Sequence, residues 1–244
     1  MTRAKRRINL LVGLWFTLGV VTIAPAGVAA AEPDPVLLLH GYRGTATSLN
    51  ELQVWLLAPA VDNNGDGRID GGGRTQVTTL QFTSQDNKVN AAAIAAATQG
   101  WARFDVVGHS MGGLSSRWFA KFVNGAAKLG SYVSLGTPQT GVYSACFFSQ
   151  SNGGQMCPTS SFLRDLNAGD DTPGATTAYA SIYSTSDEIV PYSRSRIDSA
   201  CHFQVSGLRH DNLIHSPAVT FPLVLAALDD APDSICPTGG VWRP

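Results

Sequence analysis

The stretch Phe104–Gly113 constrains the fold of this chain more than any other part of the sequence. It begins with the mostly apolar run Phe-Asp-Val-Val, which predicts a short buried strand. Gly108, Ser110 and Gly112 follow at once in the pattern Gly-x-Ser-x-Gly. Apolar residues then recur at helical spacing over Leu114–Phe122, which predicts a helix. A serine at the turn between a buried strand and a helix indicates a nucleophile.

The two glycines of this turn have a physical reason. A tight turn puts Ser110 in a strained backbone conformation, and its neighbours must approach closely, which glycine allows because it lacks a Cβ atom. The turn lifts the serine hydroxyl clear of the sheet, beside helix N–H groups that can bind an oxyanion. The alternative is an ordinary serine in a glycine-rich turn. The strand before it and the helix after it favour the nucleophile.

Residues 1–31 have the pattern of a secretory signal peptide. Four basic residues within the first seven positions precede an apolar core, Ile8–Val21, and Ala29–Ala31 offers small side chains for cleavage before Glu32. The apolar run is short and interrupted by glycine and Pro25, which favours cleavage over a membrane anchor. We therefore expect a secreted protein without a stable membrane anchor, whose single catalytic domain spans residues 32–244.

The exported part is acidic overall. Without the first 31 residues the chain has 13 basic and 18 acidic residues, a net charge of −5. No basic patch indicates binding to nucleic acid. Its four cysteines, an even count in an exported chain, favour two disulfides over zinc, for which the Cys-x-x-Cys spacing is missing. Three pairings are open, and we expect Cys146–Cys157, which closes a polar loop, and Cys201–Cys236, which ties down the C-terminal tail.

Short apolar runs typical of buried parallel strands recur along the exported chain. We expect six strands, at Val36–Leu39, Val77–Phe82, Phe104–Val107, Leu129–Leu135, Ala178–Tyr183 and His202–Val205. Helical patterns lie between and after them, at Leu49–Ala58, Val89–Ala97, Leu114–Phe122, Phe162–Leu166 and Val219–Leu228. The sequence therefore predicts an α/β fold with a mostly parallel central sheet of about six strands and helices on both faces. The long polar segment 139–177 is expected to form one wall of a cleft, without an apolar helical lid.

The loop after the first strand, His40–Gly44, is expected to contribute to the same site. Its two glycines let the backbone turn inward, and the N–H of Tyr42 is the expected second oxyanion donor. We interpret His40 as a structural histidine that braces this loop rather than as a catalytic group.

A second polar loop matches much of a calcium-binding pattern. Oxygen ligands are available at Asp62, Asn64, Asp66 and Asp70, and Gly67 suits the sharp turn. The twelfth position is a glycine rather than the usual bidentate glutamate. The loop is therefore either a weak calcium site or a polar turn that resembles one.

A serine nucleophile needs a base to take its proton and an acid to hold that base. In folds whose nucleophilic serine lies on such a strand-to-helix turn, called the nucleophile elbow, the acid and then the histidine follow the serine along the chain. Asp187 fits the acid because it lies just past a strand, with Glu188 as the alternate. For the base, His210 lies in a loop after the last strand, whereas His215 is interpreted as the start of the last helix and is the alternative.

The chain resembles the small secreted bacterial esterases and lipases of the α/β-hydrolase fold, the minimal lidless kind called class 2 lipases. The matching pieces are Val36-Leu-Leu-Leu-His-Gly-Tyr, Val106-Val-Gly-His-Ser-Met-Gly-Gly, Ser134-Leu-Gly-Thr-Pro, Ser181-Ile-Tyr-Ser-Thr-Ser-Asp-Glu-Ile-Val and Val205-Ser-Gly-Leu-Arg-His-Asp-Asn-Leu. The resemblance implies Ser110 as nucleophile, Asp187 as acid and His210 as base. It also implies Tyr42 and Met111 as backbone oxyanion donors. The polar loop at 62–73, the long 139–177 segment and the cysteines depart from the pattern.

We therefore expect a carboxylic-ester hydrolase, a triacylglycerol lipase or esterase, that forms an acyl-enzyme intermediate. Its partner is a lipid or another ester, it is expected to be a monomer, and it requires no cofactor, with calcium as an open addition. The same triad could serve an acyltransferase or an amidase. A non-catalytic secreted binding protein with a relic hydrolase fold is the alternative from another class.

Overall fold

The computed structural model describes residues 33–229 and 241–242. The predicted signal peptide, residues 1–31, lies outside these residues, and so does Cys236, the predicted partner of Cys201. No helix within the described residues is long and apolar enough to cross a membrane.

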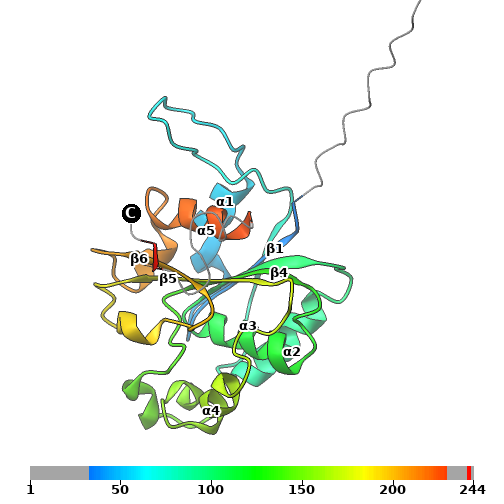
Figure 1. Ribbon diagram of the computed structural model, residues 1–244, viewed down its shortest axis with the longest axis vertical. Helices are drawn as coiled ribbons and strands as arrows, with labels where there is room; N and C mark the ends of the chain where they lie inside the picture. The colour runs from blue at the N-terminus through cyan, green and yellow to red at the C-terminus, as the bar shows by residue number, and fades with distance from the viewer. Residues whose placement is uncertain (1–32, 230–240, 243–244) are drawn as a thin grey trace, which may run out of the picture. The chain divides into compact units, whose positions relative to one another are not determined.

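A fully parallel sheet forms the centre of the domain (Figure 1). Its strand order is β2-β1-β3-β4-β5-β6-β7, and every neighbouring pair is parallel. The strands are β1 Val36–Leu39, β2 Val77–Leu80, β3 Phe104–His109, β4 Leu129–Leu135, β5 Ala178–Ser184, β6 Cys201–Val205 and β7 Val241–Trp242. The predicted fold class is confirmed. The two-residue β7 adds a strand that the sequence did not predict, because so short a run has no periodicity to detect.

Helices cover both faces of this sheet, with α1 and α5 on one side and α2 and α3 on the other (Figure 1). Alternate residues of β1 show the division: Leu37 and Leu39 pack into the α2/α3 core, whereas Val36 and Leu38 pack into the α1/α5 core. The helices are α1 Asn50–Leu57, α2 Asn87–Ala97, α3 Met111–Phe122, α4 Ser161–Asn167 and α5 Thr220–Leu228.

Several predicted boundaries shift by one to three residues, and two of these shifts have a clear local cause. The strand β2 ends at Leu80 rather than at Phe82, because the N–H of Phe82 donates to Nε2 of His40 at 2.9 Å instead of continuing the strand ladder. The helix α2 begins at Asn87, before the expected Val89, because the carboxylate of Asp86 caps its first turn by accepting the N–H of Lys88 at 2.8 Å.

The strand order places β1 and β3 at the centre of a topological switch. The chain passes from β1 outward to β2 and then returns to the other side of β1 to form β3. In open α/β sheets the carboxyl ends of strands at such a switch point border a crevice that binds ligands. The loop after β1 and the Ser110 turn after β3 therefore lie at the same place.

The long segment between β4 and β5 is more ordered than the sequence suggested. It contains the short 3₁₀ helices Tyr143–Phe147 and Gly154–Met156, followed by α4. A disulfide joins Cys146 to Cys157 within it. The buried guanidinium of Arg117, on α3, donates to the side chains of Gln139 and Asn167 and so fastens both ends of the segment to the core.

Candidate active site

Ser110 stands at a strained position between β3 and α3. Its backbone has φ 52° and ψ −122°, a conformation that side-chain-bearing residues rarely adopt. The turn is tight because β3 ends at His109 and α3 begins at Met111. A Cβ atom on Gly112 would lie 2.5 Å from the carbonyl oxygen of Leu39, so only glycine permits this approach of α3 to β1. The N–H of Met111 lies in the first turn of α3, where it has no acceptor within the helix.

The loop after β1 packs directly against this elbow. A Cβ atom on Gly41 would lie 2.9 Å from Cβ of Ser110, so the backbone at positions 41 and 42 borders the serine. His40 braces the loop as expected: it is fully buried, its Nδ1 donates to the carbonyl oxygen of Gly41 at 2.8 Å, and its Nε2 accepts the N–H of Phe82. Burial lowers the pKa of His40, which favours its neutral form.

Asp187 and His210 lie together at the other side of the crevice. Nδ1 of His210 is 2.8 Å from Oδ2 of Asp187, whose side chain is completely shielded from solvent. The other carboxylate oxygen of Asp187 accepts the N–H groups of Ile189 and Val190. His210 and Ser110 both line one cavity of about 290 Å³, together with Tyr42 from the loop after β1. The structure thus brings the predicted nucleophile, base and loop to one cavity.

Two further residues support this pair: Gly136, to which the sequence gave no role, and Glu188, the alternate acid. Gly136 follows β4 with φ +56°, and a Cβ atom there would lie 3.1 Å from Oδ2 of Asp187 and 3.2 Å from Nδ1 of His210. The carboxylate of Glu188 does not contact the imidazole of His210; it accepts the backbone N–H of His210 at 3.1 Å and pairs with Arg209. Its own backbone N–H and that of His210 lower the pKa of Glu188. Glu188 therefore positions the loop rather than the imidazole.

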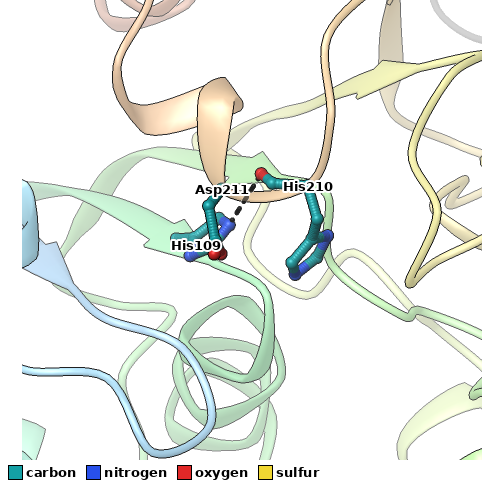
Figure 2. Close-up of side chains that lie close together, drawn as sticks. All are labelled: His109, His210 and Asp211. Carbon is teal, nitrogen blue, oxygen red and sulfur yellow. Dashed lines mark hydrogen bonds between the residues drawn. The ribbon is translucent and has the colours of Figure 1, made fainter.

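The ring of His109 packs beside that of His210, with the two ring centroids 4.8 Å apart (Figure 2). Its Nε2 lies 3.3 Å from the carbonyl oxygen of His210. Burial, with the charge of His210 as a smaller cause, lowers the pKa of His109 to about 3, so its ring is neutral near pH 7. Within the described residues, His109, His210 and Asp211 form the group of metal-ligating side chains whose ligand atoms lie within 4.8 Å of one another. One nitrogen of His109 is already engaged with the His210 carbonyl.

The alternative base, His215, has a different position from the one expected. It follows the 3₁₀ helix Asp211–Ile214 and precedes α5, so it does not begin the last helix. Its half-exposed ring lines the rim of the cavity, and its Nδ1 is 2.9 Å from a carboxylate oxygen of Glu51 on α1. The buried Asp187 contacts His210 instead, because the loop after β6 places that residue beside β5.

The loop proposed for calcium projects away from the body of the domain (Figure 1). Its side-chain oxygens satisfy the loop's own backbone: Asp62 accepts the N–H groups of Gly65 and Gly67, and Asp70 accepts the N–H of Asn63. Asn64 and Asp66 accept backbone N–H groups two residues onward in the same way. Backbone hydrogen bonds, that of Gly67 first, lower the pKa of Asp62. The predicted ligands are thus arranged in polar turns.

Comparisons with known proteins agree with this architecture. The model of the palmitoyl protein thioesterase family matches residues 35–194, more than half of the chain. The matched part contains Tyr42, Ser110 and Asp187 and ends before His210.

Solved structures show the same fold at low sequence identity. The mature form of lipase BlEst2 from Bacillus licheniformis superposes with a TM-score of 0.63 at 15% identity, over 84% of this chain and 96% of that one. Lipase B from Aspergillus fumigatus has a TM-score of 0.60 at 20% identity, over 81% of this chain and 52% of that one. Phospholipase PlaB from Legionella pneumophila gives 0.63 at 16% identity, over 81% and 60%. The chain spans about half of the fungal lipase and 50% of the propeptide form of BlEst2.

Proposed function

The chain belongs to the palmitoyl protein thioesterase family of α/β-hydrolases, and from this premise we propose that it is a secreted serine hydrolase of fatty acyl esters. Ser110 is the proposed nucleophile, His210 the base and Asp187 the acid. The backbone N–H groups of Tyr42 and Met111 are the proposed oxyanion donors. Every step uses groups of the chain itself, so the reaction requires no cofactor.

The first half of the proposed reaction forms an acyl-enzyme. Nε2 of His210 takes the proton of the Ser110 hydroxyl as Oγ attacks the ester carbonyl carbon. The negative charge that develops on the carbonyl oxygen is stabilised by the N–H groups of Met111 and Tyr42, each worth about 3 kcal/mol in the transition state. The protonated His210 then gives its proton to the leaving alcohol as the carbon–oxygen bond breaks.

Water completes the cycle by the reverse route. His210 takes a proton from a water molecule that attacks the acyl carbon, and then returns it to Oγ of Ser110 as the fatty acid leaves. The buried carboxylate of Asp187 holds the ring in the tautomer with hydrogen on Nδ1 and stabilises the imidazolium in both halves.

One observation supports this proposal above the others: His210, which is paired with the shielded Asp187, and the strained Ser110 border the same cavity. A carboxylate buried without a partner would be costly, and this one is satisfied by an imidazole and two backbone N–H groups. Backbone strain concentrated at a serine is typical of functional sites. A relic binding protein would have no reason to retain either feature.

A fluorophosphonate probe tests the proposal directly, because it reacts with activated serines. We expect stoichiometric labelling of the wild type and none of Ser110→Ala, together with loss of p-nitrophenyl ester hydrolysis. His210→Ala should also be inactive, whereas His215→Ala should retain activity. Full activity of Ser110→Ala would overturn the mechanism, and an inactive His215→Ala beside an active His210→Ala would overturn the choice of base.

Thioester hydrolysis is the second candidate, and the family match is the observation that favours it. The same acyl-enzyme forms from a thioester, with a thiol rather than an alcohol as leaving group. Parallel rates on a long-chain acyl thioester and the matching oxygen ester decide which is preferred. Added alcohol in the same assay reveals acyl transfer, and an anilide substrate reveals amidase activity.

A further inference from the structure

A long run of the chain beside the site lacks charge and yet exposes aromatic side chains. Residues 139–163 contain no Asp, Glu, Lys, Arg or His. Within this run, Phe147 is 90% exposed and Tyr143 is 66% exposed, and Phe148 is also exposed. Large apolar side chains grouped on a surface without charges are typical of an interaction site rather than of ordinary solvent-facing surface.

A second segment extends the same surface. Ile189 and Tyr192, which follow Asp187 in the chain, are both exposed. Arg194 joins the two segments, because its guanidinium donates to the carbonyl oxygens of Thr140 and Gly141 and lies over the ring of Tyr143 at 4.8 Å. We call the resulting surface the apolar rim, defined by Tyr143, Phe147, Phe148, Ile189 and Tyr192.

The apolar rim contacts residues of the proposed site at two points. The rings of Phe148 and Tyr42 pack with centroids 5.9 Å apart, and the hydroxyl of Tyr42 donates to the carbonyl oxygen of Asn152 at 3.2 Å. At the other end, the N–H of Ile189 donates to the carboxylate of Asp187. The rim is therefore continuous with the loop that offers one oxyanion donor and with the acid of the proposed triad.

The rim is also held in place rather than hinged. The Cys146–Cys157 disulfide ties the exposed aromatic turn to the 3₁₀ helix behind it. The buried Arg117 fixes both ends of the segment through Gln139 and Asn167. A surface presented in one conformation binds without the entropic cost of ordering a loop.

The charged groups at the rim favour an anionic partner. Arg194 lies over Tyr143, and Arg43 lies over the ring of Tyr42 at 5.2 Å beside the cavity. Of the nearby carboxylates, Glu188 is paired with Arg209, whereas the exposed Asp211 lines the cavity itself rather than the rim. Aromatic side chains flanked by arginine suit the boundary between lipid headgroups and acyl chains, where apolar rings are buried and cations remain near phosphates.

We infer that the apolar rim is a docking surface for a lipid aggregate with anionic headgroups, from which an acyl chain enters the cavity at Ser110. The inference rests on the proposed function for the identity of the group delivered to the serine. It adds that the substrate is met at a lipid surface and that Phe147 is the main contact.

Vesicle binding by the full exported chain tests this inference. Partition is measured by sedimentation with phosphatidylcholine vesicles, with and without phosphatidylglycerol, at low and high salt. We expect binding that is stronger with the anionic lipid and weaker in salt. Phe147→Ser should lower the partition coefficient about tenfold or more, because burying a phenylalanine is a large part of interfacial affinity. Its rate on a soluble short-chain ester should equal that of the wild type.

Val54→Ser is the matched control. Val54 is 68% exposed on α1, outside the rim, and its replacement should leave vesicle binding unchanged. The inference is overturned if Phe147→Ser binds like the wild type, if Val54→Ser loses as much, or if the chain hydrolyses soluble esters but does not bind vesicles. A wild-type dimer that Phe147→Ser dissociates would assign the rim to a second copy instead. If the protein binds vesicles but is not labelled by the fluorophosphonate probe, the proposed function is wrong and the docking surface is still supported.

Discussion

Nδ1 of His210 lies 2.8 Å from a carboxylate oxygen of Asp187 that no solvent reaches. These residues come from loops after different strands, β5 and β6, so the contact exists only in the folded chain. A shielded carboxylate in this position fixes the tautomer of the imidazole and leaves Nε2 as the nitrogen available to a nucleophile. The functional proposal depends on this pair more than on any motif.

Asp187→Asn should therefore abolish most activity while the fold persists. The amide can hold the ring in the wrong tautomer, so we expect kcat/KM on a soluble ester to fall about 10³- to 10⁴-fold. Glu188→Gln should reduce it far less, because Glu188 contacts only the backbone N–H of His210 and Arg209. Comparable losses in the two variants would contradict the assignment of the acid.

Gly136 gives a second test of the same pair. Gly136→Ala places a methyl group against Asp187 and His210 at a position with φ +56°, so both backbone strain and crowding result. Gly207 has φ +77° and nothing within 4 Å of a Cβ atom, so Gly207→Ala has the strain alone. In urea unfolding we expect Gly207→Ala to lose about 1 kcal/mol and Gly136→Ala to lose more, and only Gly136→Ala to lose activity. Equal activity in both would show that the pair tolerates displacement.

Arg117 should be important for stability although it contacts no carboxylate in the described residues. Arg117 is only 1% exposed, and its guanidinium donates to the side chains of Gln139 and Asn167 and to the backbone carbonyl of Asp171. Arg117→Met leaves these buried acceptors unpaired, at a cost of about 3 kcal/mol or more in the free energy of unfolding. Arg164→Met, at an exposed arginine, is the control and should change the melting temperature little. A small effect at Arg117 would mean that water replaces its hydrogen bonds.

Acid should destabilise the fold through buried histidines. Burial lowers the pKa of His40 and of His202 below the ordinary value of 6.5. Each therefore binds a proton more readily in the unfolded chain, so its contribution is constant above about pH 6.5 and is lost as the pH falls below that value. The slope is at most about 1.4 kcal/mol per pH unit for each histidine. His202→Gln should flatten the pH dependence of the unfolding free energy below about pH 6.5. An unchanged slope would show that His202 does not contribute to the acid destabilisation.

Calcium binding by the 62–70 loop stays a prediction. A weak site with a Kd of about 10⁻⁴ to 10⁻³ M would add roughly 1 to 3 kcal/mol of stability at about 10 mM calcium. The melting temperature should then rise with calcium, return with chelator, and not respond in Asp62→Ala. Identical melting curves with calcium and with chelator would leave the loop as a set of polar turns, whose backbone hydrogen bonds the structure already shows.

Local pattern was sufficient for much of the fold. The six main strands and five helices could be predicted from apolar periodicity, because the spacing of apolar residues within each segment indicates which of its side chains are buried. Ends moved where a distant group competed for a backbone N–H, as His40 does at Phe82. The strand β7 had too few residues to give a signal.

For the candidate site, too, some features follow from the local sequence and others only from the folded structure. The sequence by itself determined the strained serine turn and the narrow choice of acid and base, because glycine spacing and chain order are local properties. Only the tertiary structure brought His210 rather than His215 against Asp187, gave Gly136 and Glu188 their positions beside that pair, and joined residues 143–148 to residues 189–192 in one apolar rim. Those facts depend on which loops meet at the carboxyl edge of the sheet, and packing between segments far apart in the chain sets that meeting.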